Sequence, residues 1–94
     1  MKTIKLGIIG VGLIGKSHLE IYREIEGAEV IAVCDINVEE ARKVAEQYDV
    51  PHVFSDFRDL LEREEIDAVD ICLHNNLHSA FTIESLKKGK ACLL

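Results

Sequence analysis

Residues 4–15 read IKLGIIGVGLIG, an isoleucine-rich run that leads into three glycines with the spacing GxGxxG. An apolar run of this kind is typical of a strand that is buried on both faces of a parallel sheet. We predict a strand over residues 4–9 and a helix that begins among the glycines. A GxGxxG match is weak evidence by itself, but between a strand and a helix it indicates a turn that binds the phosphates of a dinucleotide.

Each glycine has a separate task in such a turn. Gly10 allows the tight change of direction, Gly12 leaves space for a pyrophosphate to approach the backbone, and Gly15 lets the helix pack closely on the strand. The free N–H groups of Leu13 and Ile14, together with the positive end of the helix dipole, face the anion. We therefore expect these five residues to bind a cofactor without the help of a lysine.

The second apolar run, residues 30–34, predicts another buried strand, and it ends at Asp35, 20 residues after Gly15. A carboxylate at this point can accept hydrogen bonds from the hydroxyls of the adenosine ribose, and it would repel a 2′-phosphate. Neither Ile36 nor Asn37 offers the cation that a phosphorylated ribose requires. NAD is therefore favoured over NADP. The alternative is that the glycines only shape a turn and that Asp35 merely caps the next helix.

Short apolar runs alternate with amphipathic stretches along the rest of the chain. We predict further strands over residues 52–54, 68–73 and 91–94. Helices are expected over residues 13–26 with Gly27 as the stop signal, from an Asn37 cap to a point before Pro51, after Ser55 or Asp56, and from near Leu77 to Gly89. In the first of these helices, residues recur near helical spacing at Leu13, Ser17, Ile21 and Tyr22, with Ile14 and Ile25 nearby. In the last, the predicted core face consists of Ala80, Phe81, Ile83 and Leu86.

This alternation predicts an α/β fold, a three-layer, doubly wound parallel sheet of the Rossmann type with strand order 3-2-1-4-5. Residues 1–94 are expected to form one dinucleotide-binding domain that is truncated after its fifth strand. The apolar end at residues 91–94 has no turn, cap or polar tail, so we expect the chain to be a fragment.

Polar side chains gather in residues 73–79, LHNNLHS, at the carboxyl end of the predicted fourth strand. Ligands bind at this edge of open α/β sheets, and we expect Leu73, Asn75 and His78 to face the cofactor. The alternative is that Asn75 or Asn76 caps the helix while the histidines are solvated. Both interpretations can hold together.

The sequence offers no metal site and no catalytic nucleophile. His74 and His78 are four residues apart, but His74 precedes the helix and no third ligand is apparent. The three cysteines lie in apolar stretches without CxxC spacing, which indicates reduced, buried thiols: Cys34, Cys72 and Cys92. His18 is expected to be a packed or surface histidine.

Composition restricts the class of partner. The chain of 94 residues has 11 Lys and Arg against 17 Asp and Glu, a net charge of 11 − 17 = −6, and no basic run. Nucleic-acid binding relies on clustered cations and is therefore excluded. No apolar run reaches 18 residues, and the first residues do not resemble a signal peptide. We expect no membrane partner and a cytoplasmic protein.

Together these motifs resemble the Gfo/Idh/MocA oxidoreductases along the whole chain. The resemblance rests on residues 8–15 with His18, on residues 33–35, and on residues 69–72 followed by Asn75 and His78. One departure is Leu73-His74, where the family usually has Thr-Pro before the asparagine. The loop backbone is therefore less restricted.

The resemblance implies that a complete protein transfers a hydride between NAD and a carbon-bound hydroxyl of a sugar, a polyol or a related compound. The family's Glu-Lys-Pro signature is expected directly after Leu94, and its catalytic residues, substrate contacts and homo-oligomer contacts are expected beyond that point. No catalytic residue can be assigned within this chain. A second hypothesis is a non-catalytic nucleotide sensor or regulator of the same fold.

Overall fold

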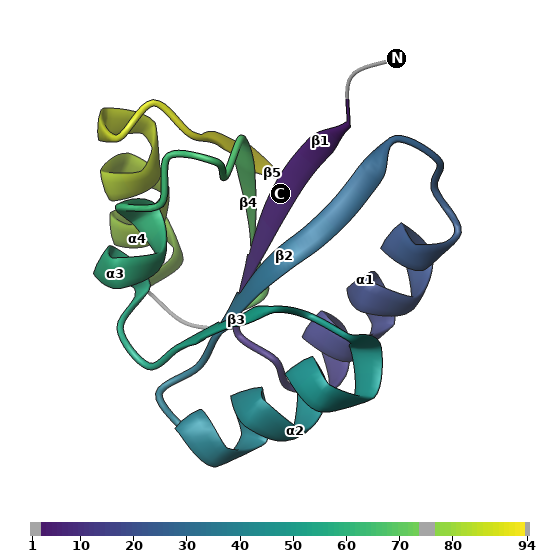
Figure 1. Ribbon diagram of the computed structural model, residues 1–94. Coiled ribbons are helices and arrows are strands. Elements are labelled where there is room, and N and C mark those ends of the chain that lie inside the picture. Colours follow the sequence, from purple (N-terminus) through teal and green to yellow (C-terminus); the bar gives the residue numbers. More distant parts are fainter. Residues whose placement is uncertain (1–2, 74–76, 94) are drawn as a thin grey trace.

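The computed structural model describes residues 3–73 and 77–93 (Figure 1). Its strands form one parallel sheet in the order β3-β2-β1-β4-β5, as predicted. In chain order, the strands are β1 (Ile4–Ile9), β2 (Ala28–Cys34), β3 (His52–Phe54), β4 (Ala68–Ile71) and β5 (Ala91–Leu93).

Four helices complete three layers: α1 (Leu13–Arg23), α2 (Val38–Tyr48), α3 (Phe57–Leu61) and α4 (Leu77–Lys87). Figure 1 shows α1 and α2 on one side of the sheet and α3 and α4 on the other. The predicted α/β class and doubly wound arrangement are thus confirmed. Within the described part of the chain, no helix is both long enough and apolar enough to cross a membrane.

Two apolar clusters hold these layers together, one on each face of the sheet. On one face, Ile8 and Val33 of the sheet pack with Leu19 of α1 and with Val44 of α2. On the other face, Ile9 and Val69 belong to the cluster that contains Leu60 of α3, and Phe81 of α4 packs against it. Because β1 and β2 contribute to both clusters, their carboxyl halves are buried on both sides, as their apolar sequences predict.

Two helix caps follow the sequence signals. The Asn37 side chain accepts a hydrogen bond from Glu40 N (3.3 Å) at the start of α2, and Asp56 accepts one from Arg58 N (2.9 Å) at the start of α3. These bonds satisfy N–H groups that a helix leaves free in its first turn. Of the two residues proposed to cap α3, the structure therefore selects Asp56.

The predicted end of the first helix is wrong, because α1 stops at Arg23 rather than residue 26. After this point Glu24 N donates to Ile21 O (3.0 Å) and Ile25 N donates to Tyr22 O (3.1 Å). These bonds join residues three apart, as in a 3₁₀-helix, so the α-helical bonding has ended. β2 then begins at Ala28, two residues earlier than predicted, because Ala28 pairs with Ile4 of β1. β4 is shorter than predicted and ends at Ile71, and Leu94 lies outside the described residues.

The core face predicted for the last helix is wrong, and the helical spacing noted in the first helix does not mark the face that it buries. Leu13, Ile21 and Ile25 of the α1 region are exposed, because the close approach at Gly15 turns Gly15 and Leu19 toward the sheet. In α4 the exposed residues are Ala80, Ile83 and Leu86, while Phe81 is half-buried and Ser85 fully buried. The Ser85 hydroxyl donates to Phe81 O (2.7 Å), so a polar residue takes an inward position that its sequence pattern did not indicate.

We expect Gly15→Ala to destabilise the fold. A Cβ at this position would collide with the carbonyl oxygen of Gly10, whereas a Cβ at Gly12 would meet no atom within 4 Å. The Gly15→Ala protein should lose about 1–3 kcal/mol of unfolding free energy in urea, and the Gly12→Ala control should lose less than about 1 kcal/mol. Equal losses in the two variants would contradict this account of the α1 contact.

Candidate dinucleotide-binding site

The carboxyl ends of the strands meet at one edge of the sheet, where backbone hydrogen bonds continue beyond the strands. Gly10 N donates to Cys34 O (2.8 Å), and Cys72 N donates to Ile9 O (2.8 Å). Asp35 N donates to Phe54 O (3.1 Å) at the end of β3. The residues that follow β1, β2 and β4 are therefore fixed side by side, at the edge where open α/β sheets bind ligands.

Gly10 and Gly12 lie in the turn from β1 to α1, and Gly15 lies in the first turn of α1. Gly10 has a φ of 94°, and a Cβ there would lie 2.7 Å from Cys72 O. A Cβ on Gly15 would overlap the Gly10 carbonyl. Of these three glycines, only Gly12 faces open space: a Cβ there would meet no atom within 4 Å. A ligand that approaches this turn would occupy that space.

The amino end of α1 has no capping side chain, unlike those of α2 and α3. The first helical bond runs from Lys16 N to Gly12 O (3.0 Å), so the N–H groups of Leu13 and Ile14 have no partner within the helix. The first turn carries no acidic residue. These two N–H groups and the helix dipole therefore form a cradle suited to an anion.

Asp35 lies beside this cradle with its carboxylate held by two backbone groups. Its Oδ2 accepts a hydrogen bond from Val11 N (3.0 Å) inside the glycine turn, and its Oδ1 accepts one from Asn37 N (2.9 Å). Asn37, rather than Asp35, caps α2. Each carboxylate oxygen has a second lone pair, so Asp35 can still accept hydrogen bonds from the hydroxyls of a ribose.

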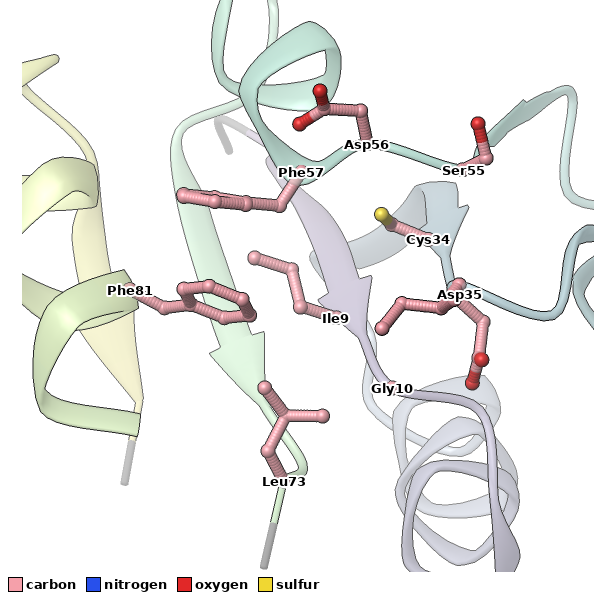
Figure 2. Close-up of a pocket in the computed structure, with 10 residues that line it drawn as sticks. Ile9, Gly10, Cys34, Asp35, Ser55, Asp56, Phe57, Leu73 and Phe81 are labelled. Carbon is pink, nitrogen blue, oxygen red and sulfur yellow. The ribbon is translucent and has the colours of Figure 1, made fainter. Parts of the chain in front are cut away.

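An open cavity of about 330 Å³ extends from Asp35 across the ends of the strands (Figure 2). The rings of Phe57 and Phe81 stack with their centroids 4.0 Å apart at its apolar side. Its size and its mostly apolar walls suit a flat aromatic ring system. The lining residues are Ile9, Gly10, Cys34, Asp35, Ile36, Ser55, Asp56, Phe57, Leu73 and Phe81.

Of the residues predicted in the loop after β4, only Leu73 can be placed, and it lines the cavity. Asn75 lies outside the described residues, and for His78 the structure describes the backbone within α4 but not the side chain. The sequence interpretation missed Phe57 and Phe81. Phe81 had been assigned to the core face of the last helix. The local sequence carries no signal for the cavity, because the two rings meet only when α3 and α4 pack side by side.

The thiol at the cavity is not an activated nucleophile. Burial, followed by the charges of Asp35 and nearby carboxylates, raises the pKa of Cys34 to about 12. The thiol is therefore protonated at neutral pH. Burial of Cys34 is confirmed, whereas Cys72 and Cys92 are only partly buried, and all three are free thiols.

We expect Cys34 to react very slowly with iodoacetamide. With a pKa of about 12, only about one molecule in 10,000 carries the thiolate at pH 8, and the rate should rise about tenfold per pH unit up to pH 10. An ordinary exposed thiol would level off near pH 9. Mass spectrometry of peptides containing Cys34 would measure the rates, and a plateau below pH 9 would contradict the raised pKa.

Residues 4–94 match the Gfo/Idh/MocA family, described as an oxidoreductase family with an NAD-binding Rossmann fold. The chain belongs to this family. The resemblance seen in the sequence is thereby confirmed, and the family's description gives NAD as the cofactor.

Curated relatives include dehydrogenases for several substrates. Inositol 2-dehydrogenase of Pseudomonas savastanoi pv. phaseolicola is 34% identical over 90 residues, which cover 94% of this chain and 27% of that protein. 4-Carboxy-2-hydroxymuconate-6-semialdehyde dehydrogenase of a Sphingobium species is 29% identical, with coverage of 93% and 28%. The chain thus spans little more than a quarter of the length of these relatives.

Solved structures confirm the Rossmann fold. The crystal structure of scyllo-inositol dehydrogenase from Lactobacillus casei with bound NAD(H) and scyllo-inositol superposes with a TM-score of 0.90 at 34% identity. The match covers 97% of this chain and 27% of that one. A probable dehydrogenase from Thermotoga maritima gives a TM-score of 0.90 at 31% identity, with coverage of 95% and 27%.

Proposed function

We propose that this domain binds NAD across the carboxyl edge of its sheet and forms the cofactor half of a dehydrogenase. The observation that carries the proposal is the position of Asp35, bonded through Oδ2 to Val11 N within the glycine turn and lining the cavity at the same time. The carboxylate that would accept hydrogen bonds from the ribose therefore lies next to the N–H groups that would bind the pyrophosphate. NAD requires both, because its adenosine ribose is joined directly to its pyrophosphate.

The proposed placement of NAD follows the order of these features along the edge. The adenine enters the cavity beside Phe57 and Phe81, and the ribose hydroxyls donate to Asp35. The pyrophosphate lies over Gly10, Gly12 and Gly15 and accepts hydrogen bonds from Leu13 N and Ile14 N. The nicotinamide half then extends past Leu73 toward Asn75 and His78. Open space beyond Gly12 supports this path, since a Cβ there would meet no protein atom.

We further propose that residues 1–94 bind the nucleotide without turnover. NAD supplies the hydride acceptor when it is bound, and this chain orients it. Among the described residues that line the cavity, the Cys34 thiol is held protonated, the Asp35 carboxylate is assigned to the ribose, and the Asp56 carboxylate caps α3. Catalytic groups, substrate contacts and subunit contacts would then come from outside these residues.

The substrate class proposed for the complete enzyme is a polyol or a sugar. Its support is that a relative of 34% identity is an inositol 2-dehydrogenase and that a solved relative holds scyllo-inositol together with NAD(H). Reduction of NAD by the isolated chain in the presence of an inositol would contradict the proposal that residues 1–94 bind the nucleotide without turnover. Binding without turnover in the full polypeptide would favour the nucleotide-sensor hypothesis.

The choice of NAD over NADP is tested by Asp35→Asn. We expect the unaltered chain to bind NAD at least about tenfold more tightly than NADP in calorimetry, because a 2′-phosphate would meet the Asp35 carboxylate. Asp35→Asn should raise the Kd for NAD about tenfold and should reduce the difference between the Kd values for NAD and NADP.

Asp59→Asn is the matched control for this variant. Asp59 is close enough for its charge to act on Cys34, but it does not line the cavity. Its removal should change the Kd for NAD by less than about twofold. Equal effects of the two variants would show that net charge, rather than the Asp35 contact, governs affinity. Thermal unfolding of each variant should accompany the titrations, because Asp35 also holds the backbone at Val11.

Gly12→Ala tests the path of the pyrophosphate. Its methyl group would occupy the open space over the turn, so the protein should fold normally yet bind NAD at least about tenfold more weakly. Adenosine, which has no phosphate, should bind Gly12→Ala and the unaltered chain equally well. Unchanged NAD affinity in a folded Gly12→Ala protein would exclude this path.

A further inference from the structure

A buried carboxylate lies on β4, away from the cavity, on the face of the sheet that α1 covers. Asp70 is only 2% exposed, and its Oδ2 lies 2.6 Å from His18 Nδ1 and 2.7 Å from the Tyr22 hydroxyl. The Cys72 thiol lies 3.4 Å from its Oδ1. His18 and Tyr22 both belong to α1, one turn apart, so the carboxylate joins this helix to β4.

The direction of these bonds follows from the chemistry of the groups. An ionised carboxylate can only accept hydrogen bonds, so His18 Nδ1 carries a proton toward Asp70 and Tyr22 donates its hydroxyl. Burial and the Asp70 contact raise the pKa of Tyr22, which keeps this hydroxyl protonated. Buried carboxylates are costly unless donors satisfy them, and Asp70 has two donors on one oxygen.

The arrangement of His18, Asp70 and Cys72 fits hydrogen bonding rather than metal coordination. His18, Asp70 and Cys72 place possible ligand atoms within 4.8 Å of one another. Nitrogen and oxygen ligands of a tetrahedral zinc ion lie roughly 3.3 Å apart, given bond lengths of about 2.0–2.1 Å. The distance of 2.6 Å between His18 Nδ1 and Asp70 Oδ2 instead fits a hydrogen bond with the proton in place.

The cluster is also not a catalytic triad. In such a triad the carboxylate and the nucleophile contact opposite nitrogens of the imidazole. Here the Cys72 sulfur lies 3.5 Å from His18 Nδ1, the nitrogen that already faces Asp70. Burial and the Asp70 charge raise the pKa of Cys72 to about 12, so the thiol is not activated.

We infer that Asp70, His18 and Tyr22 are positioning residues that set α1 relative to β4 and thereby tune dinucleotide affinity. This inference rests on the proposed function. α1 carries the N–H groups proposed for the pyrophosphate, and β4 leads through Cys72 to Leu73 at the cavity. A ligand that spans both elements binds well only when their separation and angle are correct.

Hydrogen bonds suit this task because they are directional. Apolar contacts between α1 and the sheet, such as those of Leu19, favour burial but resist sliding only weakly. The two bonds from His18 and Tyr22 to one oxygen restrict both the rotation of α1 and its shift along the sheet.

Tyr22→Phe removes one of these bonds and keeps the ring. Tyr48→Phe is the matched control, because the Tyr48 hydroxyl donates to Glu20 Oε1 at the same distance of 2.7 Å but joins α1 to α2. We expect Tyr22→Phe to raise the Kd for NAD about threefold to tenfold, and Tyr48→Phe to change it less than about twofold. The contacts proposed for adenosine, Phe57, Phe81 and Asp35, lie outside α1, so the Kd for adenosine should stay unchanged in both variants.

A second measurement does not depend on the cofactor. Residual dipolar couplings of backbone amides in the free protein report the orientation of α1 relative to β1 and β4. We expect a reorientation in Tyr22→Phe and none in Tyr48→Phe. Nitrogen-15 spectra of unaltered protein should also show a proton on His18 Nδ1, the nitrogen that faces Asp70.

The outcomes separate the two claims. Failure of the unaltered chain to bind NAD would contradict the proposed function, and the orientation of α1 would then decide the inference alone. An unchanged α1 in Tyr22→Phe would overturn the inference. So would equal weakening of NAD and adenosine, or an effect of Tyr48→Phe as large as that of Tyr22→Phe, since these results indicate general destabilisation.

Discussion

The close approach of Gly15 to the carbonyl of Gly10 is the constraint on which the rest of the site depends. Because Gly15 has no side chain, the first turn of α1 lies directly against the end of β1. Gly15 and Leu19 are then the residues that α1 buries against the sheet. This contact brings the free N–H groups of α1 to the same edge as Asp35 and the cavity. A bulkier residue at Gly15 would lift the helix and separate the anion cradle from the ribose acceptor.

Two carboxylates hold this arrangement from the strands on either side of β1. Asp35 follows β2 and accepts a hydrogen bond from Val11 N just before α1, whereas Asp70 of β4 accepts hydrogen bonds from His18 and Tyr22 farther along the helix. The glycine turn and the helix are therefore held at two points. Hydrophobic burial brings the layers together, and these directional contacts define how the layers align.

Local signals explain what could be predicted from sequence. The glycine spacing and the Asn37 cap act within a few residues, and the structure confirms the positive φ at Gly10 and the cap at the start of α2. The carboxylate after the second strand was predicted from its spacing to the glycines, and Asp35 contacts the glycine turn across 24 residues of sequence. The strand order followed from the alternation of apolar and amphipathic segments. The inward faces of α1 and α4 could not be predicted from apolar spacing, because Gly15 and Ser85, rather than large apolar residues, take inward positions.

Long-range contacts were harder to predict. Phe57 and Phe81 come from separate helices, and His18 meets Asp70 across 52 residues of sequence. One signal was present: Asp70 is a single acidic residue within an apolar run that was predicted to be a strand, and a charge in such a place requires donors from elsewhere. The sequence alone does not name those donors. His18 was expected to be packed or at the surface, and the structure shows a half-buried ring bonded to Asp70.

The proposed anion cradle contains backbone dipoles rather than free cations, and this has a consequence for the ionic-strength dependence of binding. Lys16 is the basic residue nearest to the turn in the sequence, and its Nζ lies 3.5 Å from Glu40 Oε1. The chain as a whole carries a net charge of −6. The dianionic pyrophosphate of a dinucleotide would therefore approach against long-range repulsion and be held by short-range N–H contacts. Added salt screens the repulsion and leaves those contacts largely intact, so association should become faster as ionic strength rises, the reverse of a site lined with lysines.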